Sequence, residues 1–165
     1  DADKMLTDHR LDSLAVGPHV ANAKTILDVG SGAGLPGIPL ALALPDVRVT
    51  LLDSNHKKTA FLNQAVIELN LSNVEVVCER VEKYQQKQIF NVVVSRAFSD
   101  LTEFVTLAGR LLAPDGTLLA MKGVHPFEEL AQINEGKSGF KLFDVAPLAV
   151  PGLDAERHLV FMKAA

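Results

Sequence analysis

Four glycines and one carboxylate have types and spacings suited to holding a nucleotide-like ligand. The glycines fall within eight positions, at Gly30, Gly32, Gly34 and Gly37. Glycine tolerates positive φ and lets the main chain approach a ligand closely, so such a turn presents free N–H groups. Asp53 ends the next apolar run, 23 residues after Gly30, where a carboxylate can accept both hydroxyls of a ribose. The pattern predicts a site for a ribose-containing cofactor.

Two classes of cofactor fit these glycines equally well. Gly30-x-Gly32-x-Gly34 fits an adenosylmethionine loop, whereas Gly32-x-Gly34-x-x-Gly37 fits the fingerprint of dinucleotide-binding proteins. A nicotinamide-dependent oxidoreductase is therefore an alternative to a methyltransferase, and the glycines alone do not decide between them.

The elements that position these residues alternate along the chain. Short apolar, β-branched runs predict strands at 25–29, 48–52, 74–78, 90–95 and 117–121, and helical spacing predicts helices at 38–44, 55–69, 100–112 and 128–133. Four strand–helix units followed by a fifth strand predict a mostly parallel sheet with helices on both faces. Strands at 140–146 and 158–163 have no helix between them, which predicts a terminal antiparallel hairpin. This Rossmann-like α/β arrangement is more typical of class I methyltransferases than of dehydrogenases.

The length and composition of the chain limit its domain number and the kinds of site and partner it can have. At 165 residues and 48% hydrophobic content, the chain is expected to form one domain over 1–165, with a helix at 1–17 packing on the sheet. Cys78 is the sole cysteine, so neither an intrachain disulfide nor a thiolate metal cluster is expected, and the protein is predicted to be cytoplasmic. The apolar runs are too short for a membrane helix. A net charge of −4 argues against a large nucleic-acid footprint, and the oligomeric state is left open.

Seven ordered blocks resemble one family. They are His9-Arg10-Leu11-Asp12-Ser13-Leu14, LDVGSGAGLPGIPLA, LLDS before Lys57-Lys58, Arg80-Val81-Glu82, Ser95-Arg96-Ala97-Phe98, Ala120-Met121-Lys122-Gly123 and Glu156-Arg157-His158-Leu159-Val160. The chain thus resembles the GidB family, bacterial S-adenosyl-L-methionine-dependent methyltransferases that modify guanine N7 in 16S ribosomal RNA. The resemblance implies that the substrate is this RNA or a precursor of the small subunit. It also implies a cofactor site that includes Gly30, Leu35, Val81, Glu82 and Arg96, with Gly32 and Gly34 in the turn and Asp53 on the ribose.

Guanine N7 carries a lone pair and no proton, so no general base is expected and no catalytic side chain is assigned. Basic residues are expected to hold RNA phosphates, because pairing at N7 would block the reacting atom. The candidates are Lys57, Lys58, Lys122, His125 and Arg157, whereas His158 is interpreted as structural. For Lys57 and Lys58 a solvated helix face is the other interpretation, and for Arg96 a structural ion pair. A third alternative is a cofactor-binding module that is inactive because the N-terminal helical segment usual in the family is missing.

Overall fold

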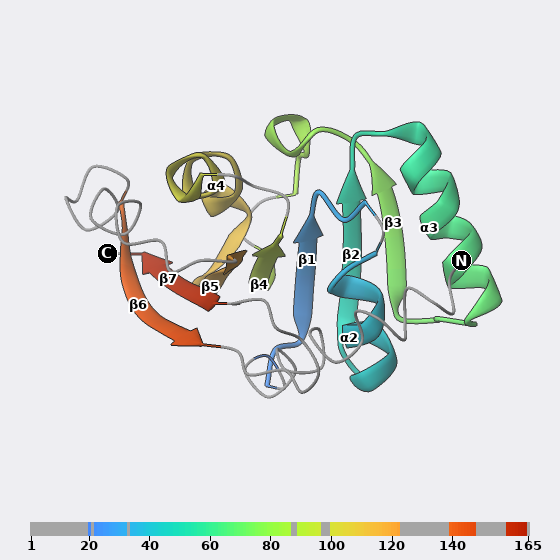
Figure 1. Ribbon diagram of the computed structural model, residues 1–165, viewed down its shortest axis with the longest axis horizontal. Coiled ribbons are helices and arrows are strands. Elements are labelled where there is room, and N and C mark those ends of the chain that lie inside the picture. Colours follow the sequence, from blue (N-terminus) through green and yellow to red (C-terminus); the bar gives the residue numbers. More distant parts are fainter. Residues whose placement is uncertain are drawn as a thin grey trace.

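In the part of the chain that the structure describes, seven strands form one sheet, in the order β3-β2-β1-β4-β5-β7-β6 (Figure 1). This computed structural model describes residues 20, 22–32, 34–86, 89–96, 100–122, 139–147 and 158–164. The strands are β1 Thr25–Val29, β2 Arg48–Asp53, β3 Val74–Cys78, β4 Phe90–Ser95, β5 Leu112–Lys122, β6 Phe140–Pro147 and β7 His158–Ala164. The helices are α2 Gly37–Ala43, α3 His56–Glu68 and α4 Leu101–Ala108, with 3-10 turns η1 Val81–Lys83 and η2 Gly109–Leu111. The helices predicted at 1–17 and 128–133 lie outside the described residues.

Strands β1 to β5 pair in parallel, and the last two strands pair antiparallel, β7 with β5 and β6 with β7. The predicted parallel sheet with a terminal hairpin is confirmed. Strand β1 lies between β2 and β4, so the winding of the sheet reverses beside it. In open α/β sheets this reversal opens a crevice at the carboxyl ends of the strands, which is where ligands bind.

The central strands β1 and β4 are buried on both faces, which explains why they are nearly all apolar. In β1 the side chain of Ile26 packs in a cluster with residues of α2 and α3, whereas Leu27 and Val29 pack in a second cluster with residues of α4. Burial on alternate sides fixes the register of β1, because a shift of one residue would exchange the two faces.

Two boundaries differ from the sequence prediction. Strand β5 begins at Leu112 rather than at residue 117, because Pro114-Asp115-Gly116, a sequence typical of a turn, is instead part of the strand, where the pairing with β4 is irregular. At Gly116 an added Cβ would lie 2.7 Å from Leu112 and 2.9 Å from the carbonyl oxygen of Asn91, so glycine permits this close approach. The helix predicted at 100–112 ends at Ala108 and continues as η2.

The third strand–helix unit is also different. The described residues between β3 and β4 form the turn η1 and no α-helix, so the prediction of four full units is wrong at this position. The segment after Cys78 lacks the run of helix-forming apolar residues that α3 and α4 possess, and it buries no residue in η1. One wall of the crevice is consequently a short turn.

Candidate cofactor site

The glycine turn closes the end of β1 against β2. Gly30, Gly32 and Gly34 have φ values of 69°, 54° and 85°, a region that side chains disfavour. The N–H groups of Gly30 and Ser31 donate hydrogen bonds of 2.8 and 3.0 Å to the carbonyl oxygen of Leu52 at the end of β2. The turn is therefore fixed to the strand that carries the predicted ribose carboxylate.

Asp53 links this turn to the start of α3. Its Oδ2 accepts a 2.9 Å hydrogen bond from the N–H of Gly32, and its Oδ1 accepts one of 2.8 Å from the N–H of Asn55. The side chain is 8% exposed. Because an ionised carboxylate offers about four acceptor positions, each oxygen retains capacity for a ligand hydroxyl. The geometry fits the role of ribose partner that the sequence predicted for Asp53.

Asp28 lies beneath the same turn and is fully buried. Its Oδ2 accepts hydrogen bonds from the Ser31 hydroxyl at 3.1 Å and from the Gly37 N–H at 2.9 Å. Within the described part of the chain its Oδ1 has no hydrogen-bond partner. Burial raises the pKa of Asp28 to about 8, although the two hydrogen bonds and the charge of Arg96 lower it. The carboxyl is therefore mostly protonated at pH 7.

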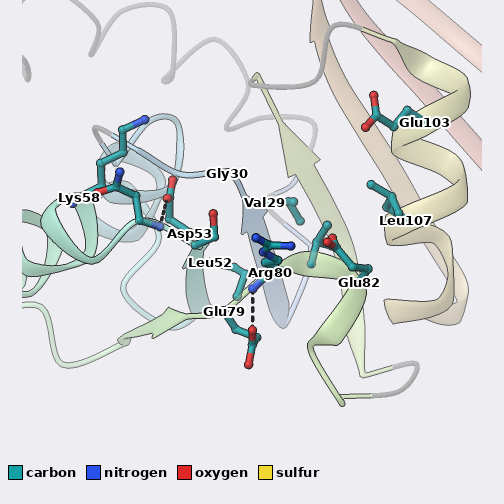
Figure 2. Close-up of a pocket in the computed structure, with 13 residues that line it drawn as sticks. Val29, Gly30, Leu52, Asp53, Lys58, Glu79, Arg80, Glu82, Glu103 and Leu107 are labelled. Atoms are coloured by element: carbon teal, nitrogen blue, oxygen red, sulfur yellow. Dashed lines mark hydrogen bonds between the residues drawn. The ribbon is translucent and has the colours of Figure 1, made fainter.

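A cavity of about 730 Å³ opens over the carboxyl ends of β1 and β2, a size typical of small-molecule sites. Figure 2 shows Asp53 and Lys58 at one end of this cavity, Glu103 and Leu107 of α4 at the other, and Arg80 between them in this view. The lining residues are Val29, Gly30, Leu52, Asp53, Ser54, Asn55, Lys58, Glu79, Arg80, Val81, Glu82, Glu103 and Leu107.

The structure brings part of the predicted cofactor site together in this cavity. Gly30, Asp53, Val81 and Glu82 line it. The other four predicted residues do not: Gly32 and Gly34 shape the turn, Leu35 is buried beside it, and Arg96 is half-buried just after β4. The charge of Arg96 nevertheless lowers the pKa of Asp28, the carboxyl beneath the glycine turn.

The predicted RNA contacts are not gathered in one place. Lys58 lines the cavity and Lys57 is exposed beside it in the first turn of α3. Lys122 ends β5 and pairs across the sheet with His158 of β7. His125 and Arg157 lie outside the described residues.

Several lining residues were missed by the sequence reasoning. Glu103 and Leu107 are four residues apart on α4, so they lie on one helix face, and this spacing was a signal that could have found them. Asp28 lies beneath the turn and not in the cavity wall, and it was also missed. Its sequence signal was a carboxylate inside an otherwise apolar strand, which must find hydrogen-bond donors or be neutral. The part of the chain that the structure describes contains no cluster of His, Cys, Asp or Glu able to hold a metal ion. Among the same residues no helix is long and apolar enough to cross a membrane.

The fold defines the class. The chain superposes on a SAM-dependent methyltransferase from Aquifex aeolicus with a TM-score of 0.76, at 19% identity over 100% of this chain and 99% of that one. It also superposes on 1,6-didemethyltoxoflavin-N1-methyltransferase from Burkholderia thailandensis, solved with bound S-adenosylhomocysteine. That TM-score is 0.70, at 16% identity over 96% of this chain and 80% of the other. The fold is thus the Rossmann-like fold of adenosylmethionine-dependent methyltransferases.

Sequence comparison identifies the family. Residues 1–160 match the GidB family, described as rRNA small subunit methyltransferase G. The chain is 56% identical to ribosomal RNA small subunit methyltransferase G of Chromobacterium violaceum and 59% identical to that of Laribacter hongkongensis. Each match covers 97% of this chain and 75% of the relative. The chain belongs to the GidB family of small-subunit ribosomal RNA methyltransferases, which confirms the resemblance seen in its sequence.

Proposed function

We propose that the chain transfers the methyl group of S-adenosyl-L-methionine to N7 of a guanine in 16S ribosomal RNA, or in a precursor of the small subunit. The observation that carries the proposal is the placement of Asp53 beside the glycine turn, with unused acceptor capacity facing a cavity of suitable size. Membership of the GidB family supports the reaction and the RNA substrate. We also propose that residues 1–165 form one domain.

The charge of the cavity favours this cofactor over a dinucleotide. Four carboxylate side chains line it, from Asp53, Glu79, Glu82 and Glu103, against two cations, from Lys58 and Arg80. Adenosylmethionine carries a net positive charge from its sulfonium and amino groups, whereas NAD carries two phosphates. A cavity with an excess of carboxylates attracts the first and repels the second. This electrostatic difference is an argument against the oxidoreductase alternative.

Binding follows from the residues already described. The glycines of the turn let the main chain approach the ligand closely, but the free N–H groups predicted from the sequence are not found at Gly30, Ser31, Gly32 and Gly34, which donate within the protein. Asp53 accepts the ribose hydroxyls, and Val81 and Glu82 form the wall for the base. Arg96 is assigned to the carboxylate of the cofactor or to an RNA phosphate, since a guanidinium directly against the sulfonium would oppose the reaction.

The bound cofactor supplies an electrophilic methyl group on a sulfonium. The protein then contributes position and environment, because the N7 lone pair is already available and needs no base to expose it. The excess of carboxylates in the cavity also stabilises the positive charge that passes from the sulfonium to the guanine ring. Lys57 and Lys58, at the rim beside Asp53, are assigned to RNA phosphates, which orient the base without occupying N7.

Titration calorimetry tests the cofactor assignment directly. Adenosylmethionine and S-adenosylhomocysteine should bind to the purified chain, and NAD should not. Binding of NAD in the absence of any binding of adenosylmethionine would overturn the methyltransferase proposal and leave the oxidoreductase alternative standing.

A further inference from the structure

The turn η1 forms one wall of the cofactor cavity and fully buries none of its residues, although Val81 and the following Tyr84 pack partly buried against the apolar cluster beneath α4. It consists of Val81–Lys83. The N–H groups of Lys83 and Tyr84 donate to the carbonyl oxygen of Arg80, at 3.0 and 3.1 Å, and the Tyr84 N–H also donates to the carbonyl oxygen of Val81 at 3.3 Å. Isolated 3-10 turns of this length have poor hydrogen-bond geometry and little stability of their own. The position of this wall must therefore depend on contacts from elsewhere in the fold.

Arg110 provides such a contact from a distant part of the chain. Its guanidinium donates one hydrogen bond of 2.6 Å to the carbonyl oxygen of Tyr84 and a second to the carbonyl oxygen of Val81. These acceptors stand at the two ends of η1, 26 and 29 residues away in sequence. One planar, charged fork thus spans the whole turn, a geometry that lysine does not reproduce.

The main chain that carries Arg110 is itself fixed in the core. Arg110 lies in η2, and its neighbour Leu111 is fully buried in the cluster beneath α4. The Tyr84 ring adds a second contact to the same region, with its centroid 6.4 Å from that of Phe90 in β4. The guanidinium therefore ties the main chain of η1 to η2, in addition to the packing of Val81 and Tyr84 against the cluster beneath α4.

We propose that Arg110 is a positioning residue for cofactor binding, acting through the carbonyl groups of η1. With the fork in place, Val81 and Glu82 stand where they line the cavity opposite the glycine turn. Without it, the turn samples other positions, and the cofactor must order it on binding, which weakens affinity. This inference rests on the proposed function, because it assigns Val81 and Glu82 to the cofactor.

Removing the Arg110 side chain should change cofactor binding and leave the stability of the fold nearly unchanged. Arg110 is exposed, so truncating it opens no cavity in the core. The apo melting temperature of Arg110→Ala should stay within about 3 °C of the parent. Loss should appear only in the order of η1 and in cofactor affinity.

The test compares Arg110→Ala, Arg110→Lys and the control Arg48→Ala, which removes an exposed arginine at the first residue of β2, the opposite end from the cavity. Hydrogen exchange should accelerate about tenfold at the amides of Lys83 and Tyr84 in Arg110→Ala and stay unchanged in β1 and β2. The dissociation constant of S-adenosylhomocysteine should rise about tenfold. Arg110→Lys should be intermediate, and Arg48→Ala should match the parent. With saturating cofactor, kcat should be near that of the parent while KM for adenosylmethionine rises.

Parental exchange at Lys83 and Tyr84 together with a parental dissociation constant would overturn the inference. A large fall in the apo melting temperature of Arg110→Ala, with the parental rise in melting temperature on adding cofactor, would also overturn it. That result would mean that Arg110 stabilises the fold and has no effect on cofactor binding. Failure of the proposed function looks different, since the parent chain itself would then bind neither adenosylmethionine nor S-adenosylhomocysteine.

Discussion

Replacing Asp28 by asparagine should make the protein less sensitive to rising pH. The carboxyl is fully buried beneath the glycine turn, where its Oδ2 accepts hydrogen bonds from Ser31 and Gly37. The Oδ1 of asparagine can accept the same two bonds, and its amide NH₂ takes the place of the Oδ1 of Asp28. The substitution therefore keeps the shape and the acceptor and removes the ability to ionise, while any cost of the new amide donors beside the unpartnered Oδ1 position is the same at every pH.

The magnitude follows from the difference between the folded and unfolded pKa values. Burial raises the pKa of Asp28 from 3.8 to about 8 in the folded protein. Because the folded state holds the proton more tightly, the contribution of this group to stability is full below about pH 4 and is lost as pH rises to about 8. At roughly 1.4 kcal/mol per pKa unit, the loss over that window is on the order of 5 kcal/mol.

Urea unfolding of the parent, Asp28→Asn and the control Asp46→Asn at pH 5, 6, 7 and 8 measures the effect. Asp46 is an exposed carboxylate in a turn, so its replacement leaves the interior unchanged. The difference in the free energy of unfolding between Asp28→Asn and the parent should grow in favour of the variant from pH 5 to pH 8. The Asp46→Asn difference should stay flat. Parallel curves for Asp28→Asn and the parent would refute the assignment of a neutral, buried carboxyl.

Three further predictions concern the ligands. Asp53→Ala should weaken binding of S-adenosylhomocysteine ten- to hundredfold, since losing a charged acceptor of two hydroxyls costs about 1.5–3 kcal/mol; an unchanged calorimetric affinity with intact circular dichroism would reject the ribose role. Replacing Lys57 and Lys58 together by alanine should flatten the salt dependence of RNA binding by up to about two phosphate contacts, with cofactor affinity level; a parental salt slope would favour a solvated helix face. Arg96→Ala should leave the apo melting temperature within a few degrees and abolish most of the cofactor-induced shift in melting curves. If that variant instead loses apo stability and keeps the full shift, Arg96 is a structural ion-pair partner.

The sheet could be predicted because its signals are local. The run FNVVVS is apolar on both sides, and the structure places it as β4 between β1 and β5 with helices on both faces. Asp53 was found in the same way, because the end of a second strand after a glycine turn is defined by sequence order alone. Local signals fail where pairing decides the boundary, as at Leu112, which joins β5 by pairing with Phe90.

The missed parts of the site depend on distant contacts. Arg110 in sequence is a basic residue at a helix end, which usually means a solvated side chain, and its role follows only from the fold that brings it to Tyr84. The neutral state of Asp28 depends on complete burial by strands and helices that follow it in the chain. The apolar run around Asp28 signals that this carboxyl must find donors or be neutral but not which of the two, and a contact across 26 residues has no signal in the spacing of nearby residues.

Methyl transfer to guanine N7 of small-subunit ribosomal RNA can be measured on the purified chain. The most direct measurement incubates the purified chain and radiolabelled adenosylmethionine with 16S RNA and with small subunits that lack the modification, then digests the RNA to nucleosides. The label should co-elute with 7-methylguanosine, and borohydride and aniline should cleave the RNA at one position. Label in any other nucleoside, or no label although the same preparation binds adenosylmethionine, would contradict the proposed methyl transfer.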